Sequence, residues 1–174
     1  ITEVLKETHV RFTSLAKQKG LEFTLQVPEK DFYAHVNREA FTKIISNLLN
    51  NGVKYAGSYV RISLEVPEAD DDAKSFLIRT ENDGVIIPDE MKEEIFKPFV
   101  RFNEQEDGKV TTGTGIGLAL SRSLAELHQG TLAMEKGEES NVFCLTLPIV
   151  QDMTITLTSE QEVETEKMTE IAVG

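Results

Sequence analysis

The sequence predicts an α/β fold, because helical and extended patterns alternate along a single chain. The strongest helical pattern spans residues 38–56, and extended runs at 59–66 and 75–80 follow it. The inward positions of this helix recur at the spacing of one helix face: Phe41, Ile44, Ile45, Leu48, Leu49 and Gly52. Another helical pattern at 116–128 precedes a second pair of extended runs. This alternation is typical of a sheet covered by helices.

The N-terminal segment 2–19 predicts an amphipathic helix that ends at Gly20. Its inward positions recur at three- and four-residue intervals: Val4, Leu5, Thr8, Phe12, Leu15 and Ala16. Extended patterns at 21–27 and 32–36 follow, separated by a turn that contains a proline. We therefore expect a β-hairpin before the next helix.

The middle of the chain predicts two strands, a turn and a short helix. The strands at 59–66 and 75–80 flank the acidic segment 67–72, whose charges favour exposure to solvent. The Asn-Asp-Gly sequence at 82–84 predicts a turn. A short helix is expected within 88–97, because it begins after a proline and a Lys-Pro pair ends it.

The C-terminal half predicts a mobile segment, a helix and a hairpin. Residues 103–114 are polar and have no periodicity, which is typical of a mobile loop. The helix at 116–128 is closed by Gly130. Extended runs at 131–135 and 142–147 then predict the final hairpin.

The composition excludes several classes of protein. The chain has 174 residues, enough for about one domain, and its 40% hydrophobic content is ordinary for a globular fold. Thirty acidic and 18 basic residues give a net charge of -12, which argues against nucleic acid as a partner. Cys144 is the single cysteine, so no internal disulfide can form, as suits a reducing compartment. No apolar run approaches the roughly 18 residues of a membrane-spanning helix.

The start of the sequence suggests a piece of a longer protein. The chain begins at Ile1, without an initiator Met and inside a helical pattern. We expect one domain over 1–148, and an acidic linker or tail over 149–174 with Ile155 and Leu157 as a possible edge strand. No internal repeat is visible.

The helix at 38–56 carries a polar stripe beside its apolar face. Asn47 and Asn51 lie four residues apart, and Lys54 and Tyr55 follow within one turn. Amide oxygens can ligate Mg²⁺, and a lysine can contact phosphate. The alternative is a solvated helix edge.

Two further segments have the chemistry of a binding site. The turn at 82–84 offers hydrogen-bonding groups beside a glycine that lets a flat ligand approach the backbone, although most such turns are only turns. Residues 113–117, with glycines at 113, 115 and 117, lead straight into a helix. Backbone N–H groups and the helix dipole can therefore bind phosphate there. A flexible hinge is the alternative reading of that segment.

Taken in order, these segments resemble the ATP-binding catalytic domain of sensor histidine kinases. That superfamily includes type II topoisomerases and mismatch-repair ATPases. Residues 47–55 resemble its N box, 82–88 its first glycine box, 96–99 its F box and 113–117 its second glycine box. The resemblance covers residues 1–148. It implies a two-layer α/β sandwich of the Bergerat type, a mixed sheet with helices on one face.

The resemblance also implies roles for individual residues in binding Mg²⁺-ATP. Asn51, with help from Asn47, would hold Mg²⁺ against the triphosphate. The remaining triphosphate contacts would come from Lys54, Arg101, Lys109, Gly113, Gly115 and Gly117. Residues 103–114 would form the ATP lid.

Tyr55 would lie beside the nucleotide, and the first glycine box would meet its base. Asn82 would meet the adenine edge, accepting from the adenine amine while donating to a ring nitrogen, and Gly84 would lie beneath the ring. The sequence departs from the family here, because Asn82 replaces the usual Asp and Ile86 replaces the usual second glycine. We expect these changes to affect adenine affinity more than the binding mode.

No phosphoacceptor is expected in this chain, because His9, His35 and His128 lack the sequence context that the family's acceptor has. The resemblance therefore implies three partners: a dimerisation hairpin of the same parent that carries the acceptor histidine, a second parent subunit, and a response regulator receiver domain. It implies a cytoplasmic domain of a parent anchored in the inner membrane. Two alternatives remain, a catalytically silent nucleotide-binding or scaffolding module and a self-sufficient ATPase.

Overall fold

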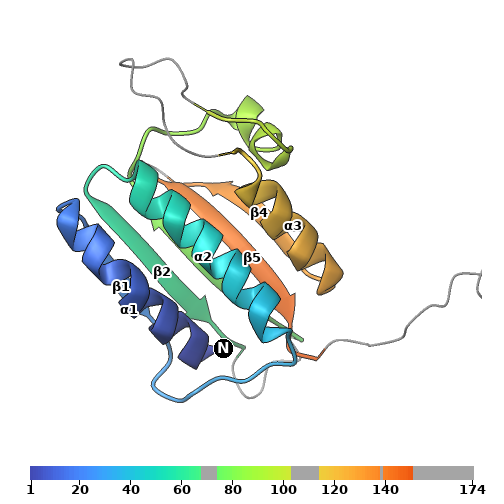
Figure 1. Cartoon of the computed structure of the whole chain (residues 1–174). Coiled ribbons are helices and arrows are strands. Elements are labelled where there is room, and N and C mark those ends of the chain that lie inside the picture. The colour runs from blue at the N-terminus through green and yellow to red at the C-terminus, as the bar shows by residue number, and fades with distance from the viewer. Residues whose placement is uncertain (68–73, 103–113, 138, 151–174) are drawn as a thin grey trace, which may run out of the picture.

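The computed structural model describes residues 1–67, 74–102, 114–137 and 139–150. Three helices lie side by side on one face of a single sheet (Figure 1). The helices are α1 (Thr2–Gln18), α2 (Arg38–Tyr55) and α3 (Gly117–Leu127), and two 3-10 turns, η1 (Asp89–Met91) and η2 (Glu94–Phe96), precede α3. This confirms the two-layer α/β sandwich.

Across the described residues, the sheet has five strands in the order β1-β2-β3-β5-β4. Strands β1 and β2 pair in parallel and the other described neighbours are antiparallel, so the sheet is mixed as expected. The strands are β1 (Glu22–Gln26), β2 (Tyr59–Glu65), β3 (Ser75–Asn82), β4 (Thr131–Lys136) and β5 (Asn141–Pro148). The final hairpin, β4 with β5, is confirmed.

The core lies between the helices and the central strands. Alternate residues of β3 are buried, and Phe76 and Ile78 meet the apolar face of α2. Each fully buried Leu or Ile stabilises the fold by about 1.5–3 kcal/mol. Gly52 lets α2 approach β2 closely, since a Cβ at this position would lie 3.0 Å from the Val60 side chain.

The predicted hairpin of 21–27 with 32–36 is wrong. β1 pairs with β2 instead, and residues 32–36 have no strand structure. Their backbone groups bind elsewhere, because the Phe32 N–H donates to the Thr2 hydroxyl at 2.9 Å and the His35 N–H donates to the Ile149 carbonyl at 2.8 Å. The segment thus joins the start of α1 to the end of β5.

In place of the one short helix predicted within 88–97, the structure has two 3-10 turns, η1 and η2. The second is followed by Lys97, which is extended before Pro98 as expected. The segments 68–73, 103–113 and 151–174 lie outside the described residues, and with them most of the acidic loop, most of the predicted lid and the predicted edge strand. Within the described part of the chain, no helix is both long and apolar enough to span a bilayer.

Candidate functional site

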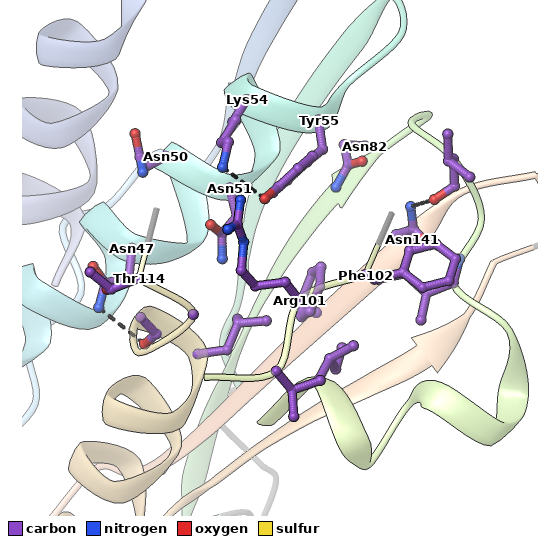
Figure 2. Close-up of a pocket in the computed structure, with 18 residues that line it drawn as sticks. Asn47, Asn50, Asn51, Lys54, Tyr55, Asn82, Arg101, Phe102, Thr114 and Asn141 are labelled. Carbon is purple, nitrogen blue, oxygen red and sulfur yellow. Dashed lines mark hydrogen bonds between the residues drawn. The ribbon is translucent and has the colours of Figure 1, made fainter. Parts of the chain in front are cut away.

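A cavity of about 310 Å³ lies where the second half of α2, the end of β3 and the start of α3 meet (Figure 2). Eight of its eighteen lining residues belong to the set that the sequence predicts. These residues are Asn47, Asn51, Lys54, Tyr55, Asn82, Arg101, Gly115 and Gly117. The fold therefore joins segments that are up to 70 residues apart in the chain.

Asn47 joins α2 to the first turn of α3. Its Nδ2 donates to the Gly117 carbonyl at 3.2 Å and to the Ser121 hydroxyl at 3.1 Å. Since a backbone carbonyl can only accept, the amide nitrogen must face α3. The Oδ1 atom of Asn47 is then the atom left to meet a ligand.

Asn50 and Asn51 also line the cavity, and the sequence analysis did not select Asn50. It lies three residues after Asn47, a spacing that places both on one side of the helix, so the same periodicity could have identified it. Asn47 and Asn51 are four residues apart on the same stripe. α2 thus presents three neutral amides to the cavity.

Two cationic side chains, Lys54 and Arg101, line the cavity. Lys54 donates to the Tyr55 hydroxyl at 2.8 Å and lies 4.6 Å from the centre of that ring. Arg101 extends towards the same region from the segment after η2 (Figure 2). None of the eighteen described lining residues is an Asp or a Glu. This charge distribution favours an anion such as phosphate.

The start of α3 faces the cavity with backbone N–H groups that have no partner within the helix. Gly115 has a φ of 70°, and a Cβ there would lie 2.9 Å from the Phe99 backbone. The Phe99 N–H donates to the Gly115 carbonyl at 3.0 Å, which holds this turn in place. Ile116, the N-cap residue, supplies no capping side chain, so the first-turn N–H groups can bind an anion.

The predicted F box divides between the core and the surface. Phe96 is buried against Phe143, with ring centres 6.4 Å apart, and the Arg122 guanidinium lies 3.7 Å from its ring centre. Phe99 is 73% exposed. Gly113 and Lys109 of the predicted phosphate set lie outside the described residues.

Asn82 is 3% exposed and ends β3 at the floor of the cavity. Its Oδ1 accepts from the Gly84 N–H at 3.2 Å. Gly84 itself is not among the lining residues. It is required by packing, because a Cβ there would lie 2.0 Å from the Tyr55 carbonyl oxygen.

The Asp83 carboxylate points away from the cavity, so the acidic group suggested for this turn does not reach a ligand. It accepts from the N–H groups of Gly57, Ser58 and Tyr59 and from the Ser58 hydroxyl. Burial opposes ionisation, but the hydrogen bonds from Ser58 and Tyr59 outweigh it and lower the pKa of Asp83 to about 2.

Asn141 is the most informative residue that the sequence analysis missed. It is the direct register partner of Asn82 on β5 and is also 3% exposed. Its Oδ1 accepts from the Ile87 N–H at 2.9 Å, and its Nδ2 donates to the Val85 carbonyl at 3.0 Å. Asn141 thereby holds the loop that forms one wall of the cavity. Only strand register could have identified it.

The apolar part of the cavity is lined by aliphatic and aromatic side chains beside Asn82. Such a slot suits a flat heterocycle, while the amides and cations suit the polar remainder of a ligand. The apolar lining residues are Val85, Ile87, Ile95, Val100, Phe102, Leu118 and Phe143.

The donor set fits a hard divalent ion that a ligand brings with it. Asn47 and Asn51 offer amide oxygens, and Mg²⁺ in proteins takes few protein ligands and binds substrate phosphates and water. Among the described residues, no group of three or more His, Cys, Asp or Glu could hold a metal ion. An ion here would therefore depend on the ligand's own oxygens.

Comparison with known proteins identifies relatives of this chain. A family model described as histidine kinase-, DNA gyrase B- and HSP90-like ATPase matches residues 36–151. Sensor histidine kinase WalK of Bacillus subtilis is 28% identical over 82% of this chain and 24% of its own length. Sensor protein VanSC of Enterococcus gallinarum is 30% identical over 83% of this chain and 38% of its own length. The chain thus spans well under half of these relatives.

Solved structures share the fold. The catalytic domain of histidine kinase ThkA is 26% identical, with a TM-score of 0.73 over 86% of this chain and 93% of that one. Full-length ShkA in complex with AMPPNP is 18% identical, with a TM-score of 0.72 over 86% of this chain and 30% of that one. ThkA in complex with response regulator TrrA is 23% identical, with a TM-score of 0.68 over 86% of this chain and 40% of that one.

Proposed function

The chain belongs to the family of histidine kinase-, DNA gyrase B- and HSP90-like ATPases, and on that basis we propose that it is the ATP-binding catalytic domain of a two-component sensor histidine kinase. It binds Mg²⁺-ATP and presents the γ-phosphoryl group to a histidine elsewhere in the parent protein. One observation carries this proposal: a single cavity joins the amides of α2, Asn82 at the end of β3 and the uncapped start of α3.

The catalytic contribution of this chain is positioning and charge neutralisation. The loose transition state of phosphoryl transfer requires little covalent chemistry from the protein. The N–H groups at the start of α3 bind phosphate oxygens, and Lys54 and Arg101 offset their negative charge. The apolar slot beside Asn82 holds the base. This fixes the direction in which the bound triphosphate extends from the base.

Asn51 and Asn47 hold Mg²⁺ through their amide oxygens in this proposal. The bound ion would neutralise charge on the β- and γ-phosphates. The hydrogen bonds of Asn47 to Gly117 and Ser121 orient its Oδ1, so the metal ligand and the phosphate-binding helix are held together.

The acceptor histidine lies outside this chain. None of the three histidines lines the cavity: His9 packs against Phe23, His35 lies on the surface, and His128 bonds to the Leu124 carbonyl and the Asn37 N–H. We place the acceptor on a dimerisation hairpin of a homodimeric, membrane-anchored parent. A response regulator receives the phosphoryl group, as the ThkA–TrrA complex suggests.

Calorimetric titration with Mg²⁺-ATP tests the binding part of this proposal. We expect the wild type to bind, and Asn51→Asp and Lys54→Ala to weaken binding at least tenfold. Lys43→Ala is the matched control, because Lys43 is exposed on the same helix and does not line the cavity. Absence of binding to the wild type would favour a scaffolding module.

Because the proposed acceptor histidine lies outside this chain, we expect almost no autophosphorylation of this domain by itself. Incubation with radiolabelled ATP should leave no stable phosphate on His9, His35 or His128. Addition of the parent's hairpin should restore labelling of the hairpin. Steady release of inorganic phosphate by the domain alone would instead identify a self-sufficient ATPase.

A further inference from the structure

The orientation of the Asn82 amide is determined by its neighbours. A backbone N–H can only donate, so the atom that faces the Gly84 N–H at 3.2 Å must be Oδ1. The Nδ2 atom is then the one directed towards the cavity (Figure 2). Among the described residues the structure records no hydrogen bond from Nδ2. A hydrogen-bond donor therefore faces the cavity beside the apolar slot.

The neighbouring polar groups are hydrogen-bonded elsewhere, so the donor of Asn82 is not replaced by an acceptor from them. Both polar atoms of the Asn141 amide are already hydrogen-bonded, Oδ1 to the Ile87 N–H and Nδ2 to the Val85 carbonyl. The Asp83 carboxylate is engaged by the segment 57–59 and faces away from the cavity. Several of the other lining residues are apolar, among them Val85, Ile87 and Phe143.

Purines differ in what they present to such a donor. Adenine carries an amine, a donor, at position 6 and an unprotonated ring nitrogen at position 1. Hypoxanthine and guanine carry a carbonyl, an acceptor, at position 6 and an N–H at position 1. A carboxylate only accepts, so it binds the amine and repels the carbonyl. An amide can donate to the ring nitrogen of adenine or to the carbonyl of a 6-oxopurine.

We propose that this site binds 6-oxopurine nucleoside triphosphates as well as ATP, and that Asn82 is the residue that sets this selectivity. For a 6-oxopurine, Nδ2 of Asn82 donates to the 6-carbonyl oxygen, whereas for adenine it donates to the unprotonated ring nitrogen at position 1, so a different atom of the base edge lies opposite Nδ2 in the two cases. The inference rests on the proposed function of the cavity as a triphosphate site.

Titration of the wild-type chain with the Mg²⁺ complexes of ATP and ITP tests the inference directly. ITP is the probe because it has the 6-carbonyl group without the additional 2-amino group of GTP. We expect the dissociation constant for ITP to lie within tenfold of that for ATP. A preference for ATP of more than tenfold would overturn the inference, and this comparison needs no variant.

The Asn82→Asp variant provides a second test of the inference. A carboxylate opposite the 6-carbonyl leaves two acceptors facing each other, so this variant should shift the ITP-to-ATP ratio at least tenfold towards ATP. Lys54→Ala is the control, since a phosphate contact should weaken both nucleotides equally and leave the ratio unchanged. An unchanged ratio in a folded Asn82→Asp would contradict the inference. Failure of the wild type to bind either nucleotide would instead refute the proposed function.

Discussion

The turn that carries Asn82 depends on a glycine and an aspartate. Gly84 lies so close to the end of α2 that a Cβ would meet the Tyr55 carbonyl oxygen at 2.0 Å. Asp83 binds the segment 57–59 through a set of backbone and hydroxyl donors. The position of the base-binding amide is therefore set by two residues that do not line the cavity.

Gly84→Ala should destabilise the domain by about 1–3 kcal/mol, because the end of α2 must move to admit a methyl group. Gly20→Ala is the matched control. Gly20 has a φ of 71° and a Cβ there would have nothing within 4 Å, so its alanine variant should cost only about 1 kcal/mol from backbone strain. Urea unfolding measures both. If Gly84→Ala is no less stable than Gly20→Ala, the end of α2 can move away from residue 84 at little cost in free energy.

Asp83 should make the domain sensitive to acid. Its folded-state pKa of about 2 lies below the unfolded value of 3.8, so its contribution to stability is present above pH 3.8 and is lost as the pH falls towards 2. Asp83→Asn should therefore destabilise the domain at pH 7. The difference in unfolding free energy between wild type and variant should shrink at pH 3. A difference independent of pH would assign the effect to shape rather than charge.

At the level of the elements, two side chains join the neighbouring helices α2 and α3. Asn47 links α2 to the start of α3, as described above. At the other end, His128 closes α3 by donating from Nδ1 to the Leu124 carbonyl at 2.6 Å, and its Nε2 accepts from the Asn37 N–H at 3.3 Å. Asn37 in turn caps α2 by accepting from the Ala40 N–H at 2.9 Å. The two helices that form the cavity are thus held at both ends.

His128→Phe should lower the free energy of unfolding by about 1–3 kcal/mol, because the Asn37 N–H and the Leu124 carbonyl lose the imidazole of the buried His128 as their partner. His35→Phe, at an exposed side chain, should change it by less than about 0.5 kcal/mol. Thermal unfolding followed by circular dichroism compares the two. Equal melting temperatures for His128→Phe and the wild type would mean that the helices do not depend on this contact.

At the level of the whole molecule, the two faces of the sheet differ in chemistry. One face packs against the three helices (Figure 1), and among the described residues the other face carries ion pairs between strands, such as Arg61 with Glu81. On this second face Arg79 bridges Glu65 and Glu135 and donates to the Cys144 sulfur at 3.3 Å. The cysteine is buried beneath this bridge.

Cys144 should report global unfolding. Burial, together with its hydrogen bond to Glu135, raises the pKa of the thiol to about 12, so almost no thiolate exists at pH 8. Reaction with a chromogenic disulfide reagent should therefore be slow in the folded domain and fast in urea. Its midpoint in urea should coincide with that measured by circular dichroism. Rapid reaction without denaturant would show that this face opens locally.

Local sequence patterns were enough to predict the helices, most of the strands and the residue types of the site. Periodicity is a local property, so segments such as 38–56 could be placed without knowledge of their neighbours. The polar stripe on this helix and the glycines before α3 were recognisable for the same reason. Their roles in binding remain predictions until the titrations are done.

Hydrogen bonds between groups that are distant in the chain could be assigned only from the folded structure. The segment 32–36 looks extended, yet its N–H groups bind α1 and the end of β5, which leaves β1 to pair with β2. Strand register placed Asn141 beside Asn82, and the Gly84 N–H turned the Asn82 amide nitrogen towards the cavity. Hydrogen-bond partners distant in the chain have no local sequence pattern, because each is chosen by competition among all the donors and acceptors that the fold brings together.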